Sequence, residues 1–231
     1  MNQEQKWFYG QRIKVTVKNF LKKNISAQYA ASRQEALDIV LGMITAGAVV
    51  SRGDSITVDQ VGIIPELFKR GQNKIIDPLA RDAQGQYLLP ELEQRKNKAR
   101  EVFSSDIFLV GTNAVTMDGK LVNIDAWGNR VAPMIFGPDK VIVIAGVNKI
   151  VKDVDAALDR IHNYAAPMNA KRHAIKHQRK DFGDLPCAKG GICVDCNHDW
   201  RICRYTTIIE GATIREKERI SVVLVGEDLG I

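Results

Sequence analysis

The hydrophobic positions of the chain follow two patterns that alternate from about residue 48 onward. Apolar residues at helical spacing predict helices, whereas short continuous apolar runs predict buried strands. The predicted strands are 48–50, 74–76, 107–110, 121–124, 141–145, 205–209 and 220–225, and the predicted helices between them are 58–68, 89–104 and 153–176. This alternation is typical of an α/β protein with a mainly parallel sheet flanked by helices.

The N-terminal part of the chain carries helical patterns only. Residues 3–23 have an amphipathic spacing, and a second helix starts at Ser32, with Glu35 three positions later as in a capping box. We therefore expect an N-terminal helical segment over residues 1–47 and an α/β domain over residues 48–231. The chain is 45% hydrophobic, which is enough for a full core in a protein of this length.

No segment of the sequence is apolar enough to cross a bilayer. The longest uninterrupted apolar stretch, Val141 to Val147, is far shorter than the roughly 20 residues that a membrane-spanning helix needs. The first six residues mix charged and polar side chains and do not resemble a signal peptide. The sequence predicts a cytoplasmic protein without membrane insertion.

The net charge of +6 is concentrated in one stretch near residue 175. Its basic residues are Lys171, Arg172, Lys176, Arg179 and Lys180. No aromatic residue is interleaved with them, so bases of a nucleic acid would have no stacking platform. We expect a solvated helix face or a surface turned toward an anionic group, and no nucleic-acid partner.

All four cysteines lie in one short polar insert, residues 183–204. They are Cys187, Cys193, Cys196 and Cys203, with the spacing C-x5-C-x2-C-x6-C. A disulfide framework does not fit a reducing compartment. Four thiolates would repel one another unless a cation or a cluster neutralises them. The spacing therefore predicts one shared metal or iron–sulfur site.

Three interpretations of this site remain open. A [4Fe–4S] cluster uses four cysteines and accepts irregular spacing, and it is the interpretation we favour. Structural zinc also takes four cysteines, but usually as two close pairs, and only Cys193 and Cys196 form such a pair. A redox-active thiol pair would leave Cys187 and Cys203 unexplained. His162 and His198 are interpreted as ordinary side chains rather than ligands.

Three polar loops follow predicted strands, at residues 51–57, 111–118 and 123–130. In parallel sheets, ligands bind at the carboxyl ends of the strands. The residues predicted to bind a small anion by backbone, hydroxyl and amide donors are Gly53, Ser55, Thr57, Gly111, Thr112, Asn113, Asn123, Gly128 and Asn129. Asp125 is the candidate catalytic base, and Arg130 is the candidate clamp for a carboxylate.

The sequence resembles a known family. The run DIFLVGTNAVTMDGKLVNIDAWGNRVAPMIFGPDKVIVIAGVNKIVKDVDAALDRI, together with GDSITVDQVGI before it and ISVVLVGEDLG at the close, is similar to the LUD domain, typified by lactate utilization protein C. The segment PCAKGGICVDCNHDWRICRY resembles a stand-alone branch of that family with extra cysteines. The resemblance implies the NagB/RpiA/CoA transferase-like fold. It also implies a link to the oxidation of lactate to pyruvate, alongside iron–sulfur partner subunits.

These observations lead to one favoured hypothesis and two alternatives. The favoured one is a LUD-type oxidoreductase, or part of one, that binds lactate or another hydroxy acid and carries a [4Fe–4S] or zinc centre. The second is a non-redox enzyme acting on a sugar phosphate or an acyl-coenzyme A. The third is a non-catalytic subunit of an iron–sulfur oxidoreductase complex. A homodimer is expected by analogy with the fold alone.

Overall fold

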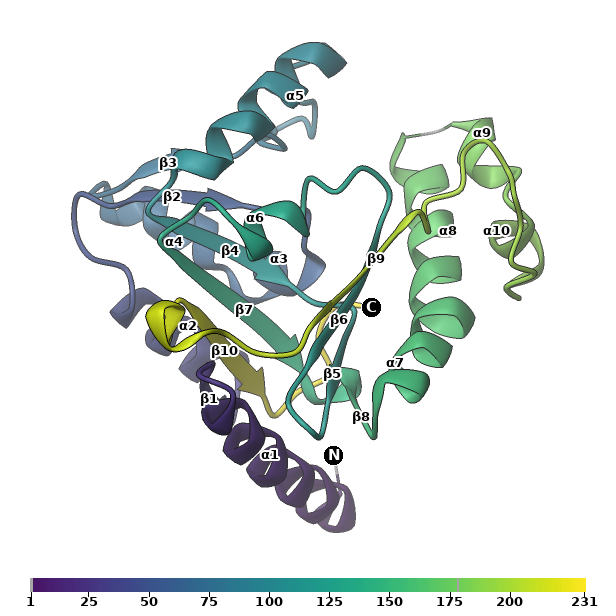
Figure 1. The fold of residues 1–231 in the computed structure, drawn as a ribbon. Helices are drawn as coiled ribbons and strands as arrows, with labels where there is room; N and C mark the ends of the chain where they lie inside the picture. Colours follow the sequence, from purple (N-terminus) through teal and green to yellow (C-terminus); the bar gives the residue numbers. More distant parts are fainter. Residues whose placement is uncertain (1, 178) are drawn as a thin grey trace.

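Two sheets form the centre of the protein. Its computed structural model describes residues 2–177 and 179–231. In that part of the chain the larger sheet has six parallel strands in the order β1-β10-β7-β4-β2-β3, and the smaller has four in the order β8-β5-β6-β9 (Figure 1). The larger sheet contains β1 (Ser26–Ala30), β2 (Val49–Arg52), β3 (Lys74–Ile76), β4 (Ile107–Gly111), β7 (Lys140–Gly146) and β10 (Ile220–Val225). The smaller contains β5 (Ala114–Thr116), β6 (Leu121–Asp125), β8 (Ile150–Val151) and β9 (Tyr205–Ile209).

Helices cover the larger sheet and extend beyond it. They are α1 (Gln3–Lys22), α2 (Arg33–Gly42), α3 (Ile56–Val61), α4 (Ile63–Arg70), α5 (Leu92–Arg100), α6 (Ala132–Ile135), α7 (Val154–Arg160), α8 (Ala166–His177), α9 (Lys180–Gly183) and α10 (Pro186–Gly190). A π turn, Ile161–Ala165, joins α7 to α8. Helices α8 to α10 form a lobe beside the two sheets, and α5 projects away from them (Figure 1).

Alternating side chains of the central strands build two separate cores. On β4, Phe108 and Val110 pack on the same side as α1 and the smaller sheet, whereas Ile107 and Leu109 pack on the side of α2, α3 and α4. All four side chains are buried. Strands that are buried on both faces read as continuous apolar runs, which is why these strands were visible in the sequence.

The predicted α/β class, with a mainly parallel sheet flanked by helices, is confirmed. The predicted helix over 58–68 is instead two helices, because Gly62 takes a left-handed conformation (φ +81°) between α3 and α4. The sequence did not predict β1, which pairs with β10 and so joins the N-terminal segment to the main sheet. Nor did it predict β5, a three-residue strand of the smaller sheet.

The turn between β5 and β6 presses against α1. Gly119 has φ +81°, and a Cβ at this position would lie 2.8 Å from the backbone N of Phe20 in α1. Gly128 has the same φ but open space around it. We expect Gly119→Ala to lower the free energy of unfolding by about 3 kcal/mol, because backbone strain is added to a clash, and Gly128→Ala by only about 1 kcal/mol. Urea unfolding of the two variants tests this difference, and equal losses would contradict the close approach of the turn to α1.

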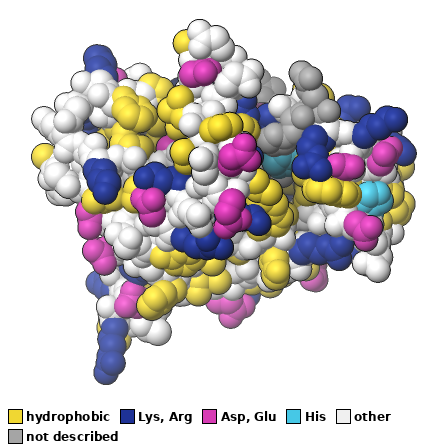
Figure 2. All heavy atoms as spheres, turned by 90° about the horizontal axis from the view of Figure 1, so that it is seen from above, with side chains coloured by type: hydrophobic (Ala, Val, Ile, Leu, Met, Phe, Trp, Pro, Cys, Tyr) yellow, Lys and Arg dark blue, Asp and Glu magenta, His cyan; other side chains and the backbone are white. Residues whose placement is uncertain are grey.

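The surface carries charges of both signs. Seen from above, Lys and Arg side chains are mixed with Asp, Glu and hydrophobic ones rather than forming one basic field (Figure 2). Part of the basic stretch is paired, because Arg172 and Lys176 lie against Asp54, and Arg179 lies against Asp181. Within the described residues, no helix combines the length and the hydrophobicity that spanning a membrane requires.

Candidate functional site

The carboxyl ends of β2, β4 and β7 meet at one edge of the larger sheet, since these strands are parallel. Three of the predicted ligand-binding residues come together there. A Cβ on Gly111 would lie 2.6 Å from Ser55 Oγ, and one on Gly53 would lie 3.2 Å from Arg130 Cγ. A side chain at Gly111 would displace Ser55, and one at Gly53 would crowd Arg130, so both glycines favour the close approach of the loops. Ser55 Oγ also accepts a hydrogen bond from Val58 N (3.3 Å) and caps α3.

Arg130 lies at the centre of this edge, where neutral oxygens surround its guanidinium. Nη1 donates to Asn123 Oδ1 (2.6 Å) and Gly111 O (3.4 Å), and Nη2 donates to Asn113 Oδ1 (2.9 Å) and Ile124 O (3.0 Å). Burial lowers the pKa of Arg130 from its ordinary value, although nearby carboxylates oppose this shift. These contacts use the guanidinium to fasten the loops together.

The carboxylate of Asp125 is used in a similar way by its own loop. Its two oxygens accept hydrogen bonds from the backbone N–H groups of Ala126 (2.9 Å), Arg130 (3.1 Å) and Val131 (3.2 Å). These bonds hold the turn that presents Arg130. Gly128 and Asn129 belong to the same turn, where Gly128 supplies a positive φ and Asn129 is exposed.

Asn113 and Asn123 tie the second loop to β6. Asn123 Oδ1 accepts from Asn113 N (3.1 Å), and Asn113 Oδ1 accepts from Ile124 N (3.0 Å). Asn123 is fully buried, and its Nδ2 has no hydrogen-bond partner in the described part of the chain. An unsatisfied buried donor costs about 1–3 kcal/mol, so this amide is ready to bind an acceptor oxygen.

A buried lysine, which the sequence analysis missed, lies beside these loops. Lys149 follows β7, is 4% exposed, and donates from Nζ to Thr57 Oγ1 (3.0 Å) and Thr112 O (3.1 Å). Burial is the main cause that lowers its pKa to about 7, and the charges of Arg160 and Arg130 add to the shift. The signal in the sequence was a lysine four residues after the strongest predicted strand, 141–145.

Arg160, at the end of α7, shares one contact segment with Lys149, the loop of residues 112–113. Its Nε donates to Asn148 O (3.1 Å), and its Nη1 donates to Asn113 O (2.8 Å). Lys149 and Arg160 thus contact the consecutive carbonyls of Thr112 and Asn113. The edge of the sheet therefore holds three neighbouring cations, and their hydrogen-bond acceptors are neutral oxygens.

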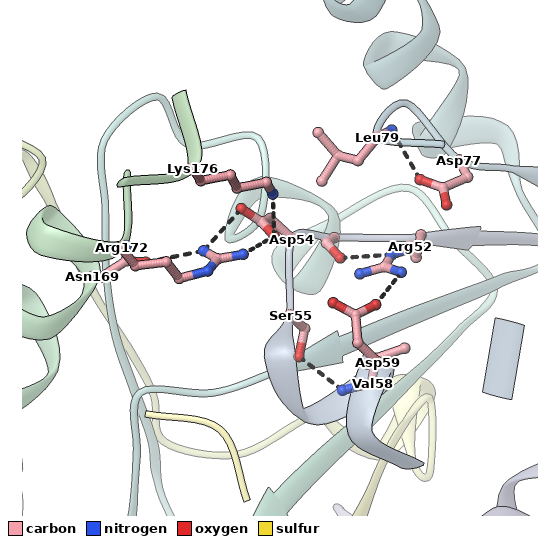
Figure 3. Close-up of polar contacts among 11 residues, drawn as sticks. Arg52, Asp54, Ser55, Val58, Asp59, Asp77, Leu79, Asn169, Arg172 and Lys176 are labelled. Carbon is pink, nitrogen blue, oxygen red and sulfur yellow. Dashed lines mark hydrogen bonds and ion pairs between the residues drawn. The ribbon is translucent and has the colours of Figure 1, made fainter. Parts of the chain in front are cut away.

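An ion-pair cluster lies at the end of β2, next to this edge (Figure 3). Asp54 accepts from Arg172 Nη2 (2.8 Å) and lies 3.8 Å from Lys176 Nζ, so α8 is fastened to the loop after β2. The hydrogen bond and charge of Arg172 hold the pKa of Asp54 well below its usual range, against the opposing effect of burial. The basic stretch thus partly faces an anion, and that anion is a side chain of the protein itself.

Arg52 and Asp77 complete this cluster. Arg52 donates from Nη1 to Asp59 Oδ1 (2.5 Å), and Asp77, which follows β3, lies on the far side of Arg52 (Figure 3). Burial raises the pKa of Asp77 above its ordinary value, despite the attraction of Arg52. These acids and bases stabilise the β2 and β3 ends of the sheet.

The four cysteines line one small cavity in the lobe formed by α8 to α10 and the loop that follows. The cavity has a volume of about 20 Å³, which is room for about one water molecule. Its other walls include His162, Leu185 and Arg201. None of the four thiols forms a disulfide. The structure thus brings the four cysteines that the sequence grouped to one cavity.

The pKa values of two thiols are shifted by burial and by the neighbouring cysteines. Burial is the main cause that raises the pKa of Cys203 to about 11 and also raises that of Cys187, and the neighbouring cysteines add to both shifts. In the described residues, no three Cys, His, Asp or Glu side chains are placed to hold a single metal ion. The thiols share one cavity without converging on one point.

The π turn between α7 and α8 brings His162 to this cavity. His162 Nδ1 lies 3.5 Å from Cys193 Sγ. Such turns insert one extra residue into a helix and are frequent at functional sites. The sequence analysis treated His162 as an ordinary side chain, and a helical pattern cannot reveal a local change of this kind. One continuous helical segment thus touches both the strand-end loops, through Arg160, and the cysteine cavity.

The fold and its sites define a class: an α/β protein with a cationic, glycine-bearing sheet edge and a four-cysteine lobe. The family model described as LUD domain matches residues 13–225, and the chain therefore belongs to the LUD domain family. No curated protein matches the chain.

Two solved structures resemble the chain to different degrees. The crystal structure of a DUF162 family protein from Deinococcus radiodurans has a TM-score of 0.53 at 12% identity, covering 94% of this chain and 98% of that one. Ribose 5-phosphate isomerase A from Neisseria gonorrhoeae has a TM-score of 0.33 at 12% identity, covering 62% and 64%. The first likeness extends over both proteins and supports the shared fold.

Proposed function

We propose that the protein takes part in the utilisation of lactate or a related 2-hydroxy acid, binds a small carboxylate at the strand-end loops and carries a [4Fe–4S] cluster at its four cysteines. Membership of the LUD family supports the link to lactate utilisation. The observation that supports the carboxylate site and the cluster is the cavity lined by all four thiols. It lies next to a helical segment that also contacts the strand-end loops.

The donor set fits a cluster better than one zinc ion. A cubane cluster binds each thiolate to a different iron, so the four sulfurs need not meet at one point. A tetrahedral zinc site requires that they do. Cys187, Cys193, Cys196 and Cys203 would hold the cluster, which supplies one-electron acceptance when bound. The cavity is small, and residues 191–203 lack regular structure, so we expect this loop to move outward on loading.

The strand-end loops have the features of a carboxylate site. Asn123 offers an unsatisfied buried amide donor, and Arg160 forms no ion pair within the described part of the chain. Two buried hydroxyl residues, Ser55 and Thr57, line the same edge. Asp125 and Arg130, the candidate base and clamp from the sequence, make contacts that favour a role in holding these loops.

The same cations also suit the non-redox alternative, because a phosphate or the phosphates of an acyl-coenzyme A would bind them equally well. The four-cysteine cavity favours the redox hypothesis, since a non-redox enzyme has no evident use for it. Iron–sulfur oxidoreductase subunits are the partners we propose, and a second copy of the chain is a further candidate.

Metal analysis after anaerobic purification tests the proposal. We expect a brown protein with about four iron and four sulfide per chain, and a loss of most of the iron in Cys203→Ser. As a matched control, Ser51→Ala changes a buried hydroxyl in β2, remote in sequence from the cysteines, and should retain full iron content. Stoichiometric zinc, or no metal in protein reconstituted with iron and sulfide, would refute the cluster.

Binding of the carboxylate is tested separately by calorimetry with lactate and pyruvate. We expect Arg160→Met to weaken binding of both by about tenfold or more, because a charged hydrogen bond to the carboxylate is lost. Binding of sugar phosphates or acyl-coenzyme A in place of both acids would favour the non-redox alternative.

A further inference from the structure

The amine of Lys149 is unusual for a buried lysine, because neutral oxygens alone accept its hydrogen bonds. Thr57 Oγ1 and Thr112 O are its acceptors, and no carboxylate in the described residues forms an ion pair with it. Buried lysines are normally paired with an acid when their role is structural. This placement favours a role that uses the neutral amine.

Two guanidinium groups lie near this amine and raise the energy of its charged form. Arg160 contacts the carbonyl of Asn113, next to the carbonyl of Thr112 that Lys149 contacts, and the charges of Arg160 and Arg130 both disfavour protonation of Lys149. A lysine that is desolvated and adjacent to another cation becomes a nucleophile at neutral pH. Lys149 meets both conditions.

Arg160 also gives the site a preference for an acid. Its Nε and Nη1 donate to backbone carbonyls, whereas its Nη2 donates no hydrogen bond within the described residues. A carboxylate could accept from Nη2 while a carbonyl carbon one bond away faces Lys149. A 2-oxo acid could meet both groups in this way, because its ketone carbon is bonded directly to its carboxylate carbon.

We propose that Lys149 is a catalytic nucleophile that forms an imine with a small 2-oxo acid, with Arg160 binding the carboxylate. This inference rests on the proposed function, because a 2-oxo acid is the oxidised form of a 2-hydroxy acid. The neutral Nζ attacks the ketone carbon, and proton transfer gives a carbinolamine. Loss of the former ketone oxygen as water then leaves a C=N bond to Nζ.

The backbone at Leu229 and Gly230 covers the amine of Lys149. A Cβ on Gly230 would lie 2.8 Å from Lys149 Nζ, so backbone without a side chain covers the amine. This segment is held by two hydrogen bonds from backbone N–H groups, Leu229 N to Asn148 Oδ1 (3.1 Å) and Gly230 N to Gln60 Oε1 (2.6 Å). Removing the second, as in Gln60→Ala, should loosen the cover and speed imine formation.

Reductive trapping tests the inference. The full chain is incubated with pyruvate and sodium cyanoborohydride, which delivers hydride to the imine carbon and leaves a stable secondary amine. We expect one adduct by intact mass, located at Lys149 by peptide mapping of the wild-type protein. An adduct absent from Lys149, or spread over surface lysines, would overturn the proposal. Peptide mapping decides this even if Lys149→Met does not fold.

Matched variants sharpen the result. Lys152→Met removes an exposed lysine three residues away and should leave trapping unchanged, whereas Lys149→Met should abolish it. Arg160→Met should slow trapping of pyruvate by about tenfold or more while leaving any slow trapping of acetone, which has no carboxylate, unchanged. Equal loss with both ketones would overturn the role of Arg160.

The two proposals fail separately. Trapping needs no iron, so an iron-loaded protein without an adduct overturns the imine and leaves the proposed function standing. Conversely, an adduct in a protein that binds neither iron nor lactate supports the imine and refutes the proposed function.

Discussion

Arg130→Met is expected to lower the free energy of unfolding by about 3 kcal/mol. The guanidinium of Arg130 donates to four neutral oxygens on two segments, residues 111–113 and 123–124. Methionine fills most of the space but donates no hydrogen bond, so all four of these hydrogen bonds are lost. Urea unfolding monitored by circular dichroism measures the loss.

A matched control separates this effect from the loss of any arginine. Arg33 pairs with Glu227 on the surface, and Arg33→Met should cost less than about 1 kcal/mol because exposed ion pairs contribute little. If Arg130→Met unfolds at the same urea concentration as the wild type yet no longer binds carboxylates, Arg130 is a ligand clamp, as its position in the sequence first suggested.

The second large effect concerns pH. Lys149 has its pKa lowered from an ordinary value of 10.5 to about 7, chiefly by burial. Between these two pH values the unfolded chain binds a proton that the folded chain does not, so this lysine makes stability rise as the pH increases. Its contribution is fully present above pH 10.5 and is lost as the pH falls toward 7. A shift of this size corresponds to about 5 kcal/mol in total, most of which falls between pH 7 and pH 10.

Lys149→Met removes this dependence, so the comparison is between wild type and variant. The difference in their free energies of unfolding should change by about 4 kcal/mol between pH 7 and pH 10, in favour of the wild type at the higher pH. Cys203 and Cys187 have raised pKa values and act in the opposite direction, but they are present in both proteins and cancel. A difference that is independent of pH would show that Lys149 stays protonated in the fold.

The architecture was predictable where burial determines the sequence pattern. β7 is buried along six of its seven residues and β10 along all six, so both read as continuous apolar runs. β1 was not predictable, because it is an edge strand whose middle residues, Gln28 and Tyr29, are exposed. Its strand form depends on pairing with β10. Pairing of that kind is not visible in a local window of sequence.

The candidate site, like the fold, was predictable only in part. That the four cysteines line one cavity was predictable because all four lie in one short segment. Ser55 and Gly111 could be grouped because the parallel strands β2 and β4 end at one edge. That rule does not apply to Arg130, which follows β6 of the smaller sheet, where β6 pairs antiparallel with its neighbours. The environment of Lys149 could not be read, since Thr57 and Thr112 lie far from it in the chain. Only the fold shows that this lysine is desolvated and beside other cations.

The single extra residue in the π turn determines the rotational position of α8 about its axis. In an α-helix each residue advances by about 100°, so removing one residue from Ile161–Ala165 would rotate α8 by roughly that angle about its axis. Arg172 and Lys176 would then turn away from Asp54. The docking of the cysteine lobe against the sheet therefore depends on the register of one irregular helical turn, and insertions or deletions there should be tolerated far less than substitutions.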